Sequence, residues 1–147
     1  ADAGAQGLLL TDVPVGGDPD LEEAVLDSRL DLIRLVAPTT RSERASVIAA
    51  SGQGFVYYIS RTGVTGARAA LTADLEDDVR ALREQVDLPV AVGFGISTPE
   101  QAAAVTGIAD GVVVGSALIT ALDQGGVEGA GAFLASLRSA MDEAKIP

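Results

Sequence analysis

The stretch LPVAVGFGISTPEQAAAVTGIADGVVVGSALI, residues 88–119, contains one complete copy of the pattern that decides the fold. Its two apolar runs, PVAVGF from Pro89 and GVVVGS from Gly111, lack polar alternation and are rich in valine. Such runs are typical of strands buried in a parallel sheet. Between them, Ser97-Thr-Pro-Glu100 has the form of a capping box and indicates the start of a helix. The stretch therefore predicts a strand–helix–strand unit.

Three similar apolar runs precede this unit: GLLLTD from Gly7, DLIRLV from Asp31 and FVYYIS from Phe55. The five runs begin 22 to 34 residues apart, which leaves room for a helical crossover between parallel strands. Apolar residues at helical spacing predict the helices, among them Leu75, Val79, Leu82 and Val86, and near the end Phe133, Leu137 and Met141. Alternating strands and helices predict an α/β fold with a parallel sheet.

Start signals mark two of the other helices. Asp18-Pro19 places a capping aspartate before a proline at the first helical position. Thr40-Arg-Ser-Glu43 has the form of a second capping box. We therefore expect helices to begin at both places.

Composition excludes several classes of function. The 147 residues include no cysteine and no histidine, which excludes disulfides, thiol nucleophiles and thiolate metal sites and removes the commonest acid–base side chain. A formal net charge of −11 argues against binding to nucleic acid. The most apolar stretch, GVVVGSALITAL, is too short and too interrupted for a membrane span, and the N-terminus has no export signal. We therefore expect a cytoplasmic protein.

Glycines and small hydroxyl residues follow three of the predicted strands. They lie at the edge where parallel α/β folds bind ligands. The segments are SRTGVTG with Gly63 and Gly66, GFGIS with Gly93 and Gly95, and GSALI with Gly115 and Ser116. Each glycine alone is also what a tight turn requires. Together they predict an anion site, because glycine lets backbone N–H groups approach an anion and a helix N-terminus favours negative charge.

Other polar residues admit two interpretations each. Asp12 follows a strand and is either a loop aspartate or a site carboxylate. Tyr57 and Tyr58 are adjacent in one strand, so one faces the inner side of the sheet and the other the helices, with core packing as the alternative to a site role. Arg61 either binds an anion or carboxylate or is solvated. Arg34 lies inside an apolar strand, and an edge position that lets its charge reach water is one explanation.

The segments LVAPTT, FVYYISRTGVTG, LPVAVGFGISTPEQ and DGVVVGSALI, in this order, resemble the C-terminal part of the tryptophan synthase α-subunit family. The resemblance runs from about Gly7 to the last helix. It implies that residues 1–147 form a single partial domain of a (β/α)8 TIM barrel, with strands 4 to 8 and their helices. It also implies a carbon–carbon lyase of tryptophan biosynthesis, which cleaves indole-3-glycerol phosphate to indole and glyceraldehyde 3-phosphate by a retro-aldol reaction.

The resemblance further implies no cofactor of its own, a pyridoxal-phosphate β-subunit as partner, and roles for individual residues. The positions around the substrate phosphate are Gly66, Phe94, Gly95, Gly115 and Ser116. The indole pocket and its ordering loop involve Tyr57, Thr65, Phe94, Asp12 and Arg61, with Asp12 ordering the loop around Thr65 and communicating with the β-subunit. The family's acid–base glutamate and partner aspartate match no position here and are expected before Ala1, so the chain alone is expected to be inactive.

Two alternatives remain open from the sequence. One is a catalytically silent phosphate-binding half barrel that self-assembles, because five of the eight strands cannot close a barrel and would leave two apolar edge strands. The other is a different phosphate-binding barrel such as a phosphoribosyl isomerase, against which the SRTGVTG segment argues. The long loop from Arg61 to Leu71 is expected to close over a bound ligand, through contacts of Thr65 with Asp12.

Overall fold

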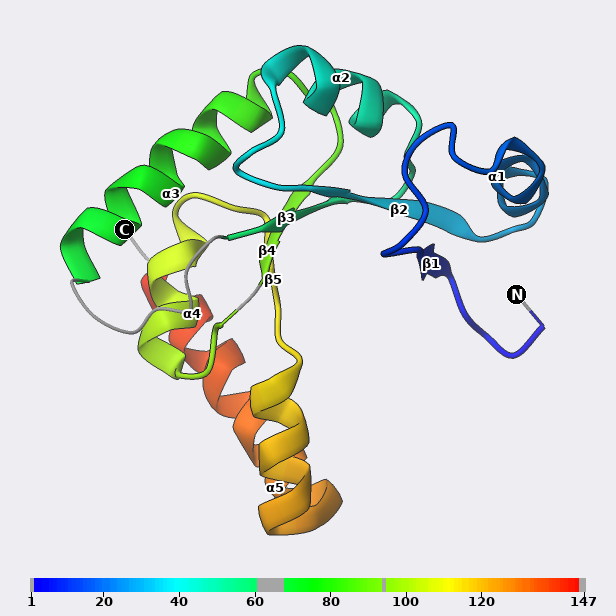
Figure 1. Cartoon of the computed structure of the whole chain (residues 1–147). Helices are drawn as coiled ribbons and strands as arrows, with labels where there is room; N and C mark the ends of the chain where they lie inside the picture. Colours follow the sequence, from blue (N-terminus) through cyan, green and yellow to red (C-terminus); the bar gives the residue numbers. More distant parts are fainter. Residues whose placement is uncertain (1, 61–67, 94, 146–147) are drawn as a thin grey trace.

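Five parallel strands lie side by side in one curved sheet, in the order in which they occur in the chain (Figure 1). The structure is a computed structural model that describes residues 2–60, 68–93 and 95–145. The strands are β1 (Gly7–Leu9), β2 (Asp31–Val36), β3 (Val56–Ile59), β4 (Val90–Gly93) and β5 (Gly111–Val113). Every strand pairs in parallel with its neighbour in sequence, so β1 and β5 form the two edges. The predicted parallel α/β fold with apolar outer strands is confirmed.

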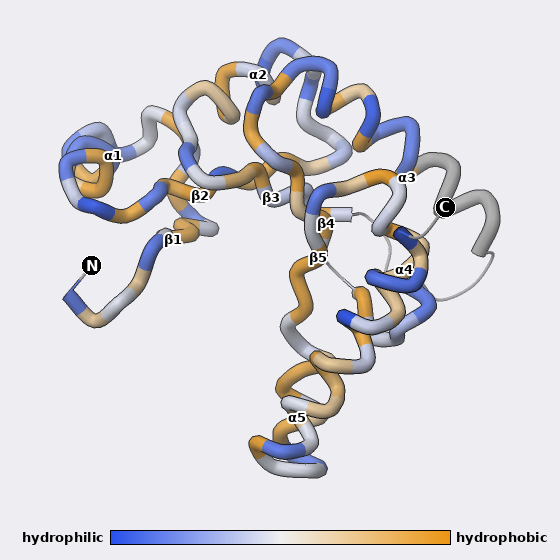
Figure 2. Tube along the Cα trace, turned by 180° about the vertical axis from the view of Figure 1, so that it is seen from behind, coloured by the Kyte–Doolittle hydropathy of each residue, from blue (hydrophilic) through white to orange (hydrophobic). Residues whose placement is uncertain are grey.

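A helix follows each strand. The helices are α1 (Pro19–Leu26), α2 (Ser42–Ala50), α3 (Arg68–Arg83), α4 (Pro99–Thr106) and α5 (Ser116–Ala144). Figure 1 shows α1 to α4 arranged around the outer side of the curved sheet, while its inner side faces open space. In Figure 2, hydrophobic positions recur along the helices that cover the sheet. The described residues thus form one half of a barrel.

The hydrophobic core lies between the sheet and its helices. Strand residues on the helix-facing side are buried, namely Leu32, Val36, Val56, Tyr58, Val90 and Val92. On the inner side Tyr57 and Val113 are only partly buried, and Leu9 is 39% exposed. The sequence suggested strands buried on both faces. In the described part of the chain burial is more complete on the outer face than on the inner one, against which no described element packs. The outer residues of the edge strands, Leu8 and Val112, are only partly buried, and Ile33 is buried on the inner face.

The start of α3 differs from the sequence-based expectation. The helix begins at Arg68, within the segment from Arg61 to Leu71 that we expected to be a loop. The preceding residues 61–67 lie outside the described residues, so the expected closure of this loop over a ligand stays a prediction. Further along, Val79 and Leu82 are buried in the core, and Leu75 and Val86 pack against it, which confirms the predicted apolar face.

Two helix starts follow from capping chemistry. Asp18 caps α1 as predicted, its side chain accepting the backbone N–H of residue 21 at 3.0 Å. A capping box also forms at α4, but one residue later than predicted. The N-cap is Thr98 and not Ser97, and the reciprocal partner is Gln101 and not Glu100. The prediction of a capping box at the start of α4 is therefore confirmed, but its predicted position was wrong by one residue.

The capping box predicted from Thr40 to Glu43 does not form. The N-cap of α2 is Arg41, which makes no side-chain capping bond. Thr40 instead caps the turn before the helix, because its Oγ1 accepts the backbone N–H of Ala37 at 3.1 Å. The hydroxyl that would have capped the helix is thus used by the preceding turn.

The last helix consists of two segments that meet at Gly126. The backbone there is non-helical, with φ 62° and ψ −160°. The first segment points away from the sheet and the second returns towards α4 (Figure 1). Leu137 in the second segment is buried, with Phe133 and Met141 packed beside it, which confirms the predicted apolar face. The first segment begins at Ser116, shortly after β5.

Candidate functional site

The C-terminal ends of β3, β4 and β5 stand level with one another. Ile59 pairs in register with Gly93, and Gly93 with Val113. Gly95 and Gly115 each follow two residues after this paired level, at the same edge of the sheet. Two of the three loops expected to hold phosphate therefore leave the sheet side by side. Four of the predicted site residues lie outside the described residues: Arg61, Thr65, Gly66 and Phe94.

Gly95 has a backbone conformation that favours glycine. Its φ is 79°, in the left-handed region that residues with a side chain rarely adopt. The next residue, Ile96, is buried in the core and anchors the loop. The turn is thereby fixed in a shape that leaves no Cβ between its backbone and an approaching ligand.

The N-terminus of α5 is open to solvent. Gly115 is the N-cap, and it makes no side-chain capping bond. A Cβ built on Gly115 would have no heavy atom within 4 Å, and Ser116 is exposed. The first amides of a helix have no acceptor within the helix, and the helix dipole adds partial positive charge there. This arrangement suits an anion, with the Ser116 hydroxyl as a further donor.

Tyr57 and Tyr58 face opposite sides of the sheet, as their alternation predicts. The ring of Tyr57 lies over Gly93 on the inner side, where any Cβ on residue 93 would collide with it. It helps to line a groove of about 440 Å³ together with Leu9, Ile33 and Val113. Tyr58 is buried under the helices, and its hydroxyl donates to Asp78 Oδ2 at 2.7 Å. Tyr58 is therefore a packing residue, whereas Tyr57 is available to a ligand on the inner side.

Ser60 is a residue at this edge that the sequence analysis did not single out. It is buried, and both its backbone N–H and its hydroxyl donate to the carbonyl of Gly93, at 3.1 Å and 3.2 Å. The two strand ends that precede the expected phosphate loops are thus joined. The position of Ser60, as a small hydroxyl residue at the end of an apolar strand, could have identified it from the sequence.

Arg34 is not at the edge of the sheet. It lies on β2, between β1 and β3, and only 4% of it is exposed. Its Nη2 forms an ion pair with Glu22 Oε2 on α1 at 2.8 Å. The idea that its charge reaches water from an edge position is therefore wrong, because a carboxylate from the covering helix neutralises the charge in place. Glu22 was not singled out from the sequence.

The pKa of Glu22 is held below its usual value. The largest cause is the hydrogen bond that its Oε1 accepts from the backbone N–H of Gly16 at 2.8 Å, and Arg34 acts in the same direction. Burial and the nearby Asp18 oppose these effects. The carboxylate thus stays charged at neutral pH and links α1 to both β2 and the β1–α1 loop, residues 10–18. Asp12 lies in this loop and is exposed.

The described residues contain neither a candidate metal centre nor a candidate membrane span. No group of three or more histidine, cysteine, aspartate or glutamate side chains within residues 2–60, 68–93 and 95–145 could hold a metal ion. No helix in the same part of the chain is long and apolar enough to cross a membrane.

The sequence profile of the family described as Tryptophan synthase alpha chain matches residues 1–145. The chain belongs to this family. The match covers every strand and helix described above, so the edge that carries Gly95 and Ser116 is part of a tryptophan synthase alpha chain fold. The resemblance inferred from the sequence is confirmed.

Curated relatives carry the same family description. The chain is 43% identical over 129 residues to the tryptophan synthase alpha chain of Novosphingobium aromaticivorans, covering 88% of this chain and 48% of that one. It is 47% identical over 142 residues to that of a Geobacter species, covering 94% and 53%. The chain thus spans about half the length of the curated relatives it matches, and it corresponds to their C-terminal part.

Solved structures agree with the half-barrel architecture. The alpha chain from Legionella pneumophila superposes with a TM-score of 0.85 at 33% identity, covering 99% of this chain and 55% of that one. Tryptophan synthase from M. tuberculosis gives a TM-score of 0.81 at 33% identity, with coverages of 95% and 52%. The predicted partial TIM barrel is confirmed. The comparisons assign no role to single residues, so the roles of Asp12, Tyr57, Gly95, Gly115 and Ser116 stay predictions.

Proposed function

We propose that the full-length protein containing this chain cleaves indole-3-glycerol phosphate to indole and glyceraldehyde 3-phosphate, and that this chain supplies the phosphate and indole pocket. The observation that carries the proposal is the shared edge of β4 and β5. There the left-handed turn at Gly95 and the open N-terminus of α5 at Ser116 stand side by side. Membership of the tryptophan synthase alpha chain family supports the choice of substrate.

In this proposal the phosphate oxygens accept hydrogen bonds from backbone N–H groups near Gly95 and at the start of α5, and from the hydroxyl of Ser116. The indole ring lies on the inner side of the sheet near Tyr57. Asp12 orders the loop around Thr65 when substrate is bound. The acid and base that a retro-aldol cleavage requires are assigned to no residue of this chain.

We further propose that the protein works in the cytoplasm with a pyridoxal-phosphate β-subunit as partner, as expected for tryptophan biosynthesis. The similarity to tryptophan synthase from M. tuberculosis supports this partner. The family match favours neither a catalytically silent half barrel nor a phosphoribosyl isomerase.

The test uses the full-length protein and glycerol 3-phosphate as the probe of the phosphate site. Ser116→Ala is expected to weaken binding by about 0.5–1.5 kcal/mol, the net contribution of one hydrogen bond. Gly95→Val should weaken binding more, since its side chain occupies the space of the anion and its left-handed backbone becomes strained. The measurement is calorimetric titration.

The matched control is Ser136→Ala in the second segment of α5, an exposed serine whose hydroxyl bonds only its own helix in the described structure, to the carbonyl of Phe133. It should leave binding unchanged. Equal affinity of wild type and Ser116→Ala would contradict the phosphate site. Absence of indole release by the full-length protein with its β-subunit would contradict the proposed reaction.

A further inference from the structure

The contacts of Arg34 point to a second task for this part of the chain. Arg34 lies on the helix-facing side of β2, with Leu32 and Val36 on the same side of the strand and Val56 as its register partner on β3. All three neighbours are apolar and buried. A charge in such surroundings requires a partner, because an unpaired buried charge costs much free energy.

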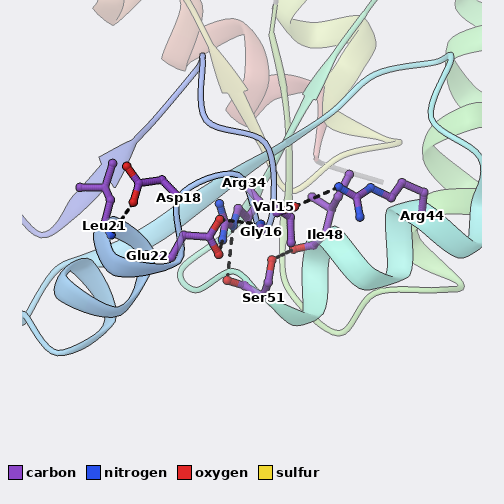
Figure 3. Close-up of polar contacts among 9 residues, drawn as sticks. All are labelled: Val15, Gly16, Asp18, Leu21, Glu22, Arg34, Arg44, Ile48 and Ser51. Atoms are coloured by element: carbon purple, nitrogen blue, oxygen red, sulfur yellow. Dashed lines mark hydrogen bonds and ion pairs between the residues drawn. The ribbon is translucent and has the colours of Figure 1, made fainter.

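Glu22 is that partner, and it uses both carboxylate oxygens. Oε2 makes the 2.8 Å ion pair with Arg34 Nη2. Oε1 accepts the backbone N–H of Gly16 at 2.8 Å. The side chain of Glu22 is only 14% exposed. One carboxylate therefore ties the β1–α1 loop to the middle of β2 (Figure 3).

The neighbours of Gly16 in the loop are held as well. Val15 accepts a hydrogen bond through its carbonyl from Arg44 Nη2 on α2 at 3.3 Å. Gly17 donates its N–H to the carbonyl of Pro14 at 2.8 Å, which closes a tight turn. Val15 is thus fixed to α2 and Gly16 to α1 (Figure 3), and the turn from Pro14 to Gly17 joins the residues around them. Residues 14–17, held at several backbone atoms, therefore fix the C-terminal half of the loop.

Arg34 is in turn held in place by the end of α2. Its Nε donates to the carbonyl of Ser51, the C-cap of that helix, at 3.4 Å. Within the described residues Nη2 has no well-aligned hydrogen-bond acceptor, so its contact with Glu22 is an ion pair rather than a directed hydrogen bond. A buried ion pair contributes little net stability compared with apolar packing of the same volume. The pair instead orients the carboxylate of Glu22, so that its Oε1 points at the backbone N–H of Gly16.

We propose that the Glu22–Arg34 pair is a positioning device that sets the place of Asp12 at the C-terminal edge of the sheet. Asp12 lies in the same loop, four residues before Gly16, at the edge that carries Gly95 and Ser116. The proposal rests on the proposed function, in which Asp12 orders the loop around Thr65. Glu22 and Arg34 touch no substrate in this proposal and act only through the loop.

The experiment uses the full-length protein with its β-subunit. Arg34→Met removes the charge but keeps an unbranched chain, and Glu22→Gln keeps an acceptor for the Gly16 N–H but weakens the ion pair. Both variants should lower kcat for indole release about ten- to hundredfold, the effect of a small misplacement near a reacting group. The affinity for glycerol 3-phosphate should not change, because its site lies on β4 and β5.

A double-mutant cycle with Asp12→Ala separates positioning from general stability. If the pair acts through Asp12, Arg34→Met should cause no further loss of kcat once Asp12 is removed. Additive losses, or a parallel loss of glycerol 3-phosphate affinity, would overturn the proposal. The matched control is Arg83→Met, which breaks the ion pair with Asp110 near the start of β5, at the other end of the sheet, and should leave kcat unchanged.

Hydrogen exchange gives a readout that does not depend on activity. Exchange of the amides between Asp12 and Gly17 should become about five- to tenfold faster in Arg34→Met, as expected for loss of one hydrogen bond. Unchanged exchange would overturn the proposal even if activity falls. If Arg34→Met does not fold, Glu22→Gln carries the same comparison. A wild type that releases no indole would defeat the proposed function, and the exchange data would still decide whether the pair holds the loop.

Discussion

At the scale of the residue, the side chains of β2 and β3 divide between the two sides of the sheet. Tyr57 and Tyr58 face opposite sides because successive side chains of a strand must do so. The role of Arg34 could not be read from the sequence, because its partner Glu22 lies on a different element and becomes a neighbour only when α1 packs on the sheet. A charged residue within an apolar strand therefore indicates a buried ion pair, but the sequence does not show which residue is its partner.

The lowered pKa of Glu22 predicts a specific dependence of stability on pH. The folded state favours the carboxylate, through the Gly16 amide first and Arg34 next, so the unfolded state binds more protons in acid. This contribution to the free energy of unfolding is present above about pH 4.3, the ordinary pKa of a glutamate. It is lost as the pH falls through the lower folded pKa. Glu22→Gln should therefore make stability less dependent on pH in acid.

The measurement is urea unfolding of the full-length protein between neutral pH and about pH 3, where most carboxylates titrate. Wild type and Glu22→Gln should differ most at neutral pH and converge in acid. Glu43→Gln, an exposed residue of α2, serves as the control. A constant difference between wild type and Glu22→Gln at all pH values would show that the carboxylate charge does not contribute.

The close approach of Tyr57 to Gly93 gives a second test at this scale. A methyl group on residue 93 would overlap the tyrosine ring. Gly93→Ala should therefore lower the free energy of unfolding by about 1–3 kcal/mol, the usual cost of overpacking. In a Tyr57→Leu background the same substitution should cost clearly less, since the ring is gone. Equal costs in the two backgrounds, measured by urea unfolding, would exclude the contact as the cause.

At the scale of the element, the sequence predicted which helices exist better than where they begin. Ser97 and Thr98 are both good caps, and Glu100 and Gln101 are both good partners, so two capping boxes overlap by one residue. Proline prefers the first helical position, and Pro99 therefore selects Thr98 as the cap. At α2 the competing turn of Ala37 takes the hydroxyl of Thr40. Competition between local hydrogen bonds explains both differences.

The register of the α4 cap can be tested with two neighbouring substitutions. Thr98 accepts the backbone N–H of Gln101 through its side chain. Thr98→Ala should therefore lower the free energy of unfolding of the full-length protein by about 1 kcal/mol, the usual value of an N-cap. Ser97→Ala should change it by less than about 0.5 kcal/mol, as for most exposed positions. A larger effect of Ser97→Ala in urea unfolding would restore the register predicted from the sequence.

At the scale of the whole molecule, the sequence predicted the parallel sheet, its strand order along the chain and its apolar edges. It overestimated burial on the inner side. An apolar run shows that a strand can be buried on both faces, but it does not show whether other elements cover the inner face. Leu9, at the end of edge strand β1, illustrates the difference with its 39% exposure.

When the 147 residues are produced alone, we expect them to self-associate as concentration rises, because unpaired strand edges and apolar surface favour pairing between copies. Leu9→Lys places a charge on the β1 edge and should weaken this association. Val127→Lys on α5, where the native side chain is 82% exposed, changes the net charge equally but lies away from the sheet. Sedimentation velocity over a concentration series measures both. If the wild-type chain stays monomeric throughout, or if Val127→Lys weakens association as much as Leu9→Lys, the sheet edge is not the associating surface.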